Sequence, residues 1–211
     1  MPVDRPCSDL EHIEGNTLDH YEGSAESFWL GTRDHDVSQN IDAFLQALPK
    51  GRALDILDLG CGPGRDLCTF KAMGHRPVGL DGSKRFCEMA HQHSDCPVIH
   101  QQFLSLALKD GSFDGIFANA SLFHIPSSEL PRVLGQLHRA LRPDGILFSS
   151  NPRGNSEGWN GPRYGHYMEL GPTEVFLKKA GFDIMHHYYR PEGLPREQQP
   201  WLAIVSRRMN L

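Results

Sequence analysis

The fold of this chain is restricted above all by a glycine-rich turn that lies between a buried strand and a helix. The turn reads Gly60-Cys61-Gly62-Pro63-Gly64, follows the apolar run 53–59 and precedes a helical pattern that starts at Arg65. Alternating glycines let a backbone turn sharply and approach a ligand without a Cβ atom in the way. A strand, such a turn and a helix in this order predict a parallel sheet that binds a ligand beyond the carboxyl ends of its strands.

Strands and helices alternate along much of the remaining chain. We expect further strands at 77–80, 97–100, 113–118 and 146–149, separated by helices at about 65–73, 84–93 and 130–141. This alternation indicates a parallel sheet covered by helices on both faces. After a helix at about 173–180, the runs 182–189 and 201–206 read as strands with no helix between them, so they should pair antiparallel. The predicted fold class is α/β: a Rossmann-like, doubly wound, mostly parallel seven-stranded sheet in three α/β/α layers, ending in an antiparallel hairpin.

Three stretches lie outside this alternation. Residues 1–17 are polar and interrupted by prolines and a glycine, so we expect a loose leader. A short helix at 27–30 and a second helix from about 39 to 48, capped by Ser38, should follow. The stretch 151–171 is long and polar, and we expect a functional loop there.

Composition excludes several classes of protein. With 39% hydrophobic and 22% charged residues, the chain is globular rather than disordered. A formal net charge of −5 disfavours binding to nucleic acid, and no apolar run approaches the ~20 residues that a membrane helix needs. Five cysteines without CxxC pairs indicate reduced thiols, and the N-terminal segment lacks the basic start and apolar core of a signal peptide. We therefore expect a cytoplasmic protein.

An acid follows the second predicted strand. Asp81 ends the run Val78-Gly79-Leu80-Asp81 and lies about 20 residues after the glycine turn, the spacing at which a carboxylate reaches the two hydroxyls of a ribose. A carboxylate there suits adenosine and opposes a 2′-phosphate. The turn itself departs from the dinucleotide pattern GxGxxG, because its third glycine comes one residue early and Arg65 stands at the expected position.

Four motifs in order resemble those of one enzyme family, the class I S-adenosylmethionine-dependent methyltransferases, in the branch that modifies small metabolites. The motifs are Asp58 to Gly64, Gly79 to Asp81, Phe113 to Asn119 and Leu141 to Leu147. The antiparallel finish is similar to the last two strands of that family. The resemblance implies S-adenosylmethionine as cofactor and S-adenosylhomocysteine as its product. It implies one domain over 1–211, with 1–50 as a helical cap over the cofactor and acceptor site and 51–211 as the Rossmann-like core.

The resemblance implies a role for each matching residue. The glycine turn would hold the methionine part of the cofactor, Asp81 would bind its ribose hydroxyls, and Asn119 and Ala120 would lie under its sulfonium. Gln102 stands where family members often carry an acid that accepts from the adenine amino group. The residues expected to contact the cofactor are Tyr21, Trp29, Arg33, Gly60, Cys61, Gly62, Asp81, Gly82, Ser83, Gln102, Phe103, Leu104, Asn119 and Ala120.

The stretch 151–171 mixes aromatic and basic side chains of the kind that recognise small molecules. Arginines bind carboxylates in a fork geometry. We expect an anionic or zwitterionic acceptor derived from an amino acid, such as an imidazole or thiol compound. The alternative is that its two arginines are exposed or pair with Glu157 and Glu169. The expected substrate contacts are Asn151, Arg153, Trp159, Arg163 and Tyr164.

Methyl transfer needs a base only if the attacking atom arrives protonated. His35 and His124 are the candidates, since imidazole titrates near neutrality, and Tyr164 is a weaker one. Each histidine could instead serve in binding or packing.

Three functions stay open on the sequence. The first is methyl transfer from S-adenosylmethionine to an N, O or S atom of a small molecule. The second is a nicotinamide-dependent reductase, against which the missing GxGxxG pattern and the antiparallel finish argue. The third is a non-catalytic protein that senses S-adenosylmethionine. We expect a monomer or homodimer with no nucleic-acid or membrane partner, and no metal, because His91, His93 and Cys96 at one helix end lack a fourth ligand.

Overall fold

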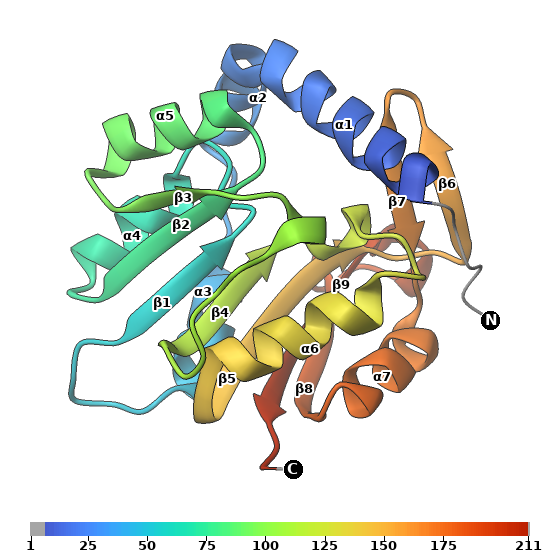
Figure 1. The fold of residues 1–211 in the computed structure, drawn as a ribbon. Helices are drawn as coiled ribbons and strands as arrows, with labels where there is room; N and C mark the ends of the chain where they lie inside the picture. The colour runs from blue at the N-terminus through green and yellow to red at the C-terminus, as the bar shows by residue number, and fades with distance from the viewer. Residues whose placement is uncertain (1–6, 211) are drawn as a thin grey trace.

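Seven strands form one sheet, in the order β3-β2-β1-β4-β5-β9-β8, in the computed structural model, which describes residues 7–210 (Figure 1). Strands β1 to β5 are parallel, and β9 pairs antiparallel with both β5 and β8. The predicted fold class is confirmed, including its antiparallel finish. The strands are β1 (Asp55–Leu59), β2 (Arg76–Asp81), β3 (Val98–His100), β4 (Phe113–Asn119), β5 (Leu141–Pro152), β6 (Ser156–Asn160), β7 (Arg163–Tyr167), β8 (Phe182–Arg190) and β9 (Trp201–Arg208).

Helices cover both faces of the sheet because successive strand residues point to opposite sides. Leu57 of β1 packs in one buried cluster with residues of α6 and α7, whereas Ile56 packs in another with Phe44 of α3 and Phe70 of α4. Figure 1 shows α6 and α7 in front of the sheet and α3 behind it. The helices are α1 (Cys7–Gly23), α2 (Ala25–Thr32), α3 (Ser38–Ala47), α4 (Arg65–Ala72), α5 (Lys84–Ser94), α6 (Leu130–Ala140) and α7 (Leu170–Lys179).

The strand order reverses between β1 and β4. From β1 the chain moves outward through β2 to β3 and then returns to the other side of β1 as β4. Loops on the two sides of such a switch point diverge, so a ligand can lie between them beyond the carboxyl ends of the strands. Helices α1 and α2 lie above this edge (Figure 1).

The expectation of a loose N-terminal leader was wrong for its described part. Residues 7–23 form α1, and residues 1–6 lie outside the described residues. Ile13 and Thr17 are buried on the inner side of this helix, which gives it a reason to order. The helix expected near 27–30 is the longer α2.

The expectation of an irregular loop over 151–171 was also wrong. Strands β6 and β7 form a two-stranded antiparallel hairpin there, separate from the main sheet. Its turn contains Gly161 with a φ of 60°, a left-handed conformation that glycine adopts without strain. The hairpin lies beside α1 (Figure 1). The amide of Tyr164 in the hairpin donates to Thr17 Oγ1 of α1 at 3.1 Å.

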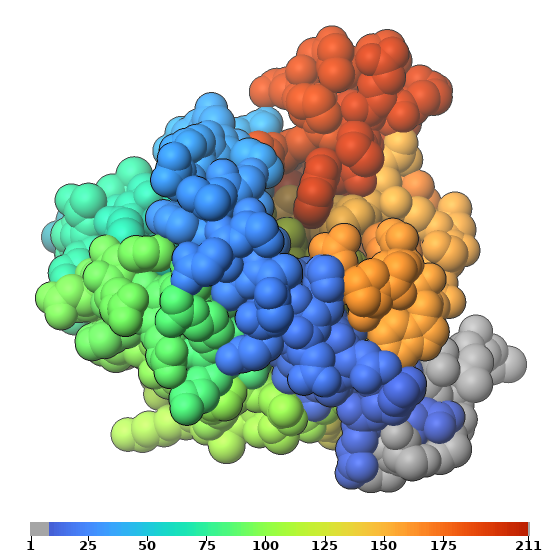
Figure 2. Space-filling view, turned by 90° about the horizontal axis from the view of Figure 1, so that it is seen from above, coloured from blue at the N-terminus to red at the C-terminus, as the bar shows by residue number. Residues whose placement is uncertain are grey.

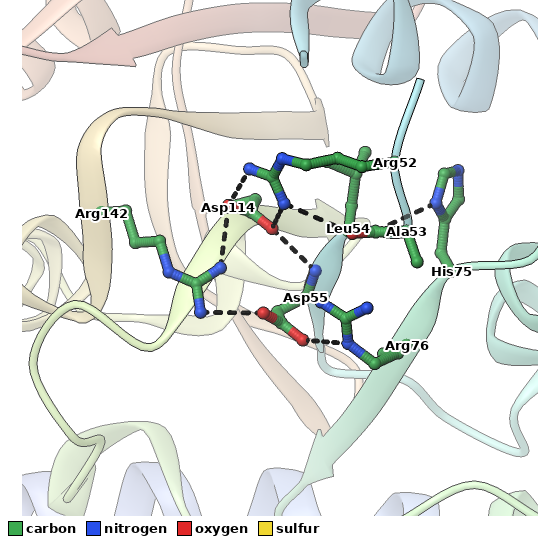
Figure 3. A network of polar contacts seen from close by, with 8 residues as sticks. All are labelled: Arg52, Ala53, Leu54, Asp55, His75, Arg76, Asp114 and Arg142. Carbon is green, nitrogen blue, oxygen red and sulfur yellow. Dashed lines mark hydrogen bonds and ion pairs between the residues drawn. The ribbon is translucent and has the colours of Figure 1, made fainter. Parts of the chain in front are cut away.

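A chain of ion pairs closes the opposite, amino-terminal edge of the sheet (Figure 3). Asp114 of β4 binds Arg52 at 2.7 Å and Arg142 at 2.8 Å, and Asp55 of β1 binds Arg142 at 2.8 Å and Arg76 at 2.6 Å. Burial would raise the pKa of Asp114, but hydrogen bonds from the two arginines and from the Asp55 amide hold it well below its usual range. These contacts tie together the starts of the central strands, far from the carboxyl edge.

Two further observations concern the described chain as a whole. None of its helices combines the length and the apolar character needed to cross a bilayer. The four cysteines whose side chains are described are free thiols.

Candidate active site

The glycine-rich turn joins β1 to α4 in a conformation that requires glycine. Gly60, Gly62 and Gly64 have positive φ values of 75°, 51° and 92°. A Cβ atom at Gly60 would lie 2.5 Å from Cβ of Ser121, and one at Gly64 would lie 2.7 Å from Cα of Ala90. Both ends of the turn therefore pack tightly on their neighbours, while Gly62 between them lines a cavity.

Asp81 ends β2 directly beside this turn. One carboxylate oxygen accepts from the Gly62 amide at 2.9 Å, and the other accepts from the Ser83 amide at 2.9 Å. Burial raises the pKa of Asp81 to about 6, although backbone N–H groups act to lower it. No described lysine or arginine pairs with this carboxylate, which lines the same cavity. Because a carboxylate oxygen can accept more than one hydrogen bond, Asp81 can still take two hydroxyl donors.

The cavity has a volume of about 790 Å³ and lies over the carboxyl ends of β1, β2 and β4. That volume falls within the range of about 300–1,000 Å³ that small-molecule sites occupy. Its walls are the glycine turn, the loops after β2, β3 and β4, helices α1 and α2, and segments 35–37 and 190–191 with Trp201. Figure 2 looks onto this edge, where α1 and α2 in blue, the β6–β7 hairpin in orange and the segment before β9 in red surround a hollow.

Helix α1 forms the roof of the cavity and is fixed there at several points along its length. Leu18 packs so closely on Gly82 that a Cβ atom at that glycine would lie 2.6 Å from Leu18 Cδ2. Thr17 accepts from the Tyr164 amide in β7, and Glu22 accepts from the first turn of α5. The roof therefore contacts elements on both sides of the switch point.

A hydrogen-bonded cluster of Tyr21, His124 and Arg163 lies on the cavity wall below α1. His124 Nδ1 is 2.7 Å from the carbonyl oxygen of Tyr164, so this nitrogen donates, and Nε2 accepts from the Tyr21 hydroxyl at 2.8 Å. Arg163 Nη1 donates to the same hydroxyl oxygen at 3.2 Å. Burial lowers the pKa of His124 to about 4, so the imidazole is neutral near pH 7. Burial also raises the pKa of Tyr21, against the effect of Arg163, so its hydroxyl keeps its proton.

The structure brings most of the predicted cofactor contacts together in this cavity, along with both candidate histidines. The predicted residues that line it are Tyr21, Trp29, His35, Gly60, Cys61, Gly62, Asp81, Gly82, Phe103, Leu104, Asn119, Ala120, His124 and Arg163.

Three predicted cofactor contacts lie outside the cavity lining. Arg33 is exposed and pairs with Asp34 at 3.2 Å. Ser83 is buried, and its hydroxyl oxygen accepts from an amide in the first turn of α5, which makes it a helix cap. Gln102 is exposed beside the turn after β3.

Four of the predicted substrate contacts also lie outside the lining: Asn151, Arg153, Trp159 and Tyr164. Arg153 binds Glu169 at 3.0 Å, which is the alternative that the sequence left open for it. Tyr164 is buried, and its hydroxyl donates to Glu157 at 2.8 Å.

Sequence reasoning missed several residues of the cavity wall, above all Glu14 and Arg190. Glu14 lies in the segment that was expected to be loose. A signal for it was present, because Ile13, Thr17 and Tyr21 recur every fourth residue and so lie on one face of a helix. Arg190 comes from the end of β8, and nothing in the local sequence marks it as a cavity residue.

Comparisons with known proteins agree with this geometry. A family model described as a methyltransferase domain matches residues 56–145. A 24-methylenesterol C-methyltransferase 2 of Oryza sativa subsp. japonica is 32% identical over 126 residues, which are 56% of this chain and 33% of that protein. A malonyl-[acyl-carrier protein] O-methyltransferase of Erwinia pyrifoliae is 32% identical over 117 residues, which are 54% of this chain and 44% of that protein. The aligned part is thus less than half the length of either relative.

A solved structure shares the fold over nearly the whole chain. The 1,6-didemethyltoxoflavin-N1-methyltransferase of Burkholderia thailandensis, with 1,6-didemethyltoxoflavin and S-adenosylhomocysteine bound, has a TM-score of 0.77. The likeness covers 99% of this chain and 94% of that one at 22% sequence identity, so it concerns the fold. The matched segment 56–145 includes the glycine turn and Asp81. Residues 56–145 of the chain thus match a methyltransferase domain, and the fold of the chain is similar to that of a solved methyltransferase.

Proposed function

We propose that this chain transfers the methyl group of S-adenosylmethionine to a small molecule that carries a negative charge, held beside the cofactor in the same cavity. The observation that supports this most strongly is the shared cavity itself. The glycine turn and Asp81 form one part of its wall, and Tyr21, His124 and Arg163 form another. We propose that the first part holds the cofactor and the second part holds the methyl acceptor.

The residues of the first part fit the cofactor. Asp81 has two free acceptor positions for the two ribose hydroxyls, and the backbone of Gly62 can approach the methionine part because no side chain intervenes. Arg65 lines the cavity at the start of α4. Its guanidinium forms a bidentate ion pair with Asp66 and donates to the Thr32 carbonyl oxygen at 2.9 Å. We propose Arg65, rather than the exposed Arg33, as the cation nearest the cofactor carboxylate.

The charge of the acceptor is inferred from two arginines. Arg163 donates to the Tyr21 hydroxyl and Arg190 to the Asp36 carbonyl, and no described carboxylate forms an ion pair with either. Arg153, by contrast, is neutralised by Glu169 outside the cavity. A guanidinium that lines a cavity without a carboxylate partner has donors left for an anionic ligand. We therefore assign acceptor recognition to Arg163 and Arg190, and keep amino-acid-derived imidazole and thiol compounds as candidate acceptors.

Methyl transfer requires the protein mainly to position the attacking atom relative to the methyl group. S-adenosylmethionine supplies a methyl group that its sulfonium already activates, and the chain holds the attacking atom in line with it while α1 keeps water out. His124 acts through Tyr21, because its only cavity-side nitrogen is engaged by that hydroxyl. Where the attacking atom carries a proton, that proton passes to Tyr21 Oη as the hydroxyl's own proton passes to His124 Nε2. His35 is exposed, so we assign it to acceptor binding.

A test compares matched pairs of acceptors with methyl-labelled cofactor. Each pair is a small carboxylic acid and its neutral amide, and the readout is label in the product. We expect transfer to the acid, and we expect Arg163→Gln to raise KM for the acid about tenfold while leaving that for the amide unchanged. Arg139→Gln is the matched control, because that arginine is exposed on α6 and, among residues 7–210, forms an ion pair only with Asp110, at 3.9 Å. Equal transfer to acids and amides would contradict the charge assignment, and binding of the cofactor without any transfer would favour a sensor.

A further inference from the structure

The place of the nucleobase follows from the strand order, given the proposed function. Asp81 ends β2 and would hold the ribose, and the glycine turn ends β1 and would hold the methionine part. Since β3 lies on the other side of β2 from β1, the base must extend towards the segment after β3. Phe103 and Leu104 of that segment line the cavity there, and Leu18 of α1 packs on the Gly82 backbone above it. These apolar walls suit the faces of a flat aromatic base.

One carboxylate is fixed at this end of the cavity. Glu14 of α1 lines the cavity, and its Oε1 accepts from the Leu104 amide at 2.9 Å. Within residues 7–210, that amide is the only hydrogen-bond donor to Glu14, and no ion pair reaches it. Burial raises the pKa of Glu14, while the Leu104 amide and the charge of Arg132 lower it. Its second oxygen is therefore held beside the base position with its lone pairs free.

We propose that Glu14 recognises adenine by accepting a hydrogen bond from the 6-amino group of the base. An ionised carboxylate only accepts hydrogen bonds, so it favours a base that presents an amino group at this edge. The Leu104 amide holds the carboxylate in place and is itself engaged, so the discriminating contact comes from a side chain. Gln102, the residue that family resemblance puts in this role, is exposed and outside the cavity lining. The hydrogen-bond acceptor for the adenine amino group is thus a side chain of α1 and not a side chain of the loop after β3.

A pair of ligands that differ only at the 6-amino group isolates this contact. The first is S-adenosylhomocysteine, and the second is its analogue with purine in place of adenine, which lacks that group. Calorimetric titration gives the ratio of the two Kd values. For the wild-type protein we expect the analogue to bind about ten- to a hundredfold more weakly, the range of a hydrogen bond to a charged group. In Glu14→Ala the ratio of the two Kd values should fall to about one, even if both ligands bind more weakly because α1 is held less firmly over the cavity.

Glu22→Ala is the matched control. Glu22 also anchors α1, through Ser83 and the start of α5, but it does not line the cavity. Its ratio should equal that of the wild type. If Glu14→Ala keeps at least a third of the wild-type ratio, the inference fails and Glu14 only caps the turn at Leu104. If the wild-type protein binds neither ligand, the proposed function fails as well, so the two failures are distinct.

Discussion

Asp81 makes the affinity for S-adenosylhomocysteine depend on pH in a defined window. Burial raises the pKa of this carboxyl to about 6. Only its ionised form can accept from both ribose hydroxyls while it also accepts from Gly62 and Ser83. Lowering the pH from about 7 to about 5 therefore removes the binding-competent form, and ligand binding below about pH 6 should release a proton.

The size of the effect follows from the same pKa. At about pH 5 roughly one molecule in eleven carries the ionised carboxyl, so the apparent affinity should be about tenfold lower than at about pH 7. The folding stability depends on pH in the opposite direction to ligand affinity. Because the pKa in the folded protein is raised above its unfolded value, the empty protein is most stable with the proton bound. It should lose about 3 kcal/mol as the pH rises through about 4 to 6.

Calorimetric titration across this window, in two buffers of different ionisation enthalpy, measures the Kd and the released proton together. Asp81→Asn is the control: it should bind more weakly at every pH and show no slope. A wild-type Kd that stays constant from about pH 5 to 7, or an equal slope in Asp81→Asn, would show that Asp81 does not titrate in this window.

Three further predictions concern single contacts. Gly64→Ala should lower the free energy of unfolding in urea by more than about 2 kcal/mol, because its Cβ would lie 2.7 Å from the Ala90 backbone at a φ of 92°; a loss below about 0.5 kcal/mol would contradict this. Tyr21→Phe leaves His124 Nε2 without its hydrogen-bond donor. It should lower kcat at least about tenfold and leave the Kd for S-adenosylhomocysteine unchanged. A change in KM alone would argue against proton transfer through the Tyr21–His124 pair. Asp114→Asn should lower the free energy of unfolding by about 2–3 kcal/mol near pH 7 and by less below about pH 4, because the carboxyl of the unfolded chain is protonated there while that of the folded protein, whose pKa is lowered, stays ionised. Equal costs at about pH 7 and about pH 3, measured by urea titration, would contradict the ion-pair origin.

The sheet could be predicted from the sequence because its strands follow a simple rule. Buried parallel strands are continuous apolar runs, and a helix with one apolar face separates each from the next along the chain, except between β3 and β4. The missing helix between 182–189 and 201–206 was enough to predict the antiparallel pairing of β8 and β9. The glycine turn and Asp81 were predictable for a related reason, because their roles depend on backbone conformation and on position at a strand end.

The roof and the hairpin could not be predicted in the same way, because they cover a cavity rather than the core. Helix α1 buries few apolar side chains, so its pattern is weak, and only the four-residue spacing of Ile13, Thr17 and Tyr21 marks it. The hairpin β6–β7 is polar, and its clearest signal is Gly161, which takes the first position of the two-residue turn between Asn160 and Arg163. The cluster of Tyr21 with residues more than a hundred positions away depends on both elements.

A comparison of two ligands tests the assignment of the cofactor site most directly. Purified protein is titrated in parallel with S-adenosylhomocysteine and with NADH, near pH 7, by calorimetry. We predict saturable binding of one S-adenosylhomocysteine per chain, lost or strongly weakened in Asp81→Asn, and no binding of NADH. Saturable binding of NADH without affinity for S-adenosylhomocysteine would contradict the assignment of the glycine turn and Asp81 to an adenosyl sulfonium.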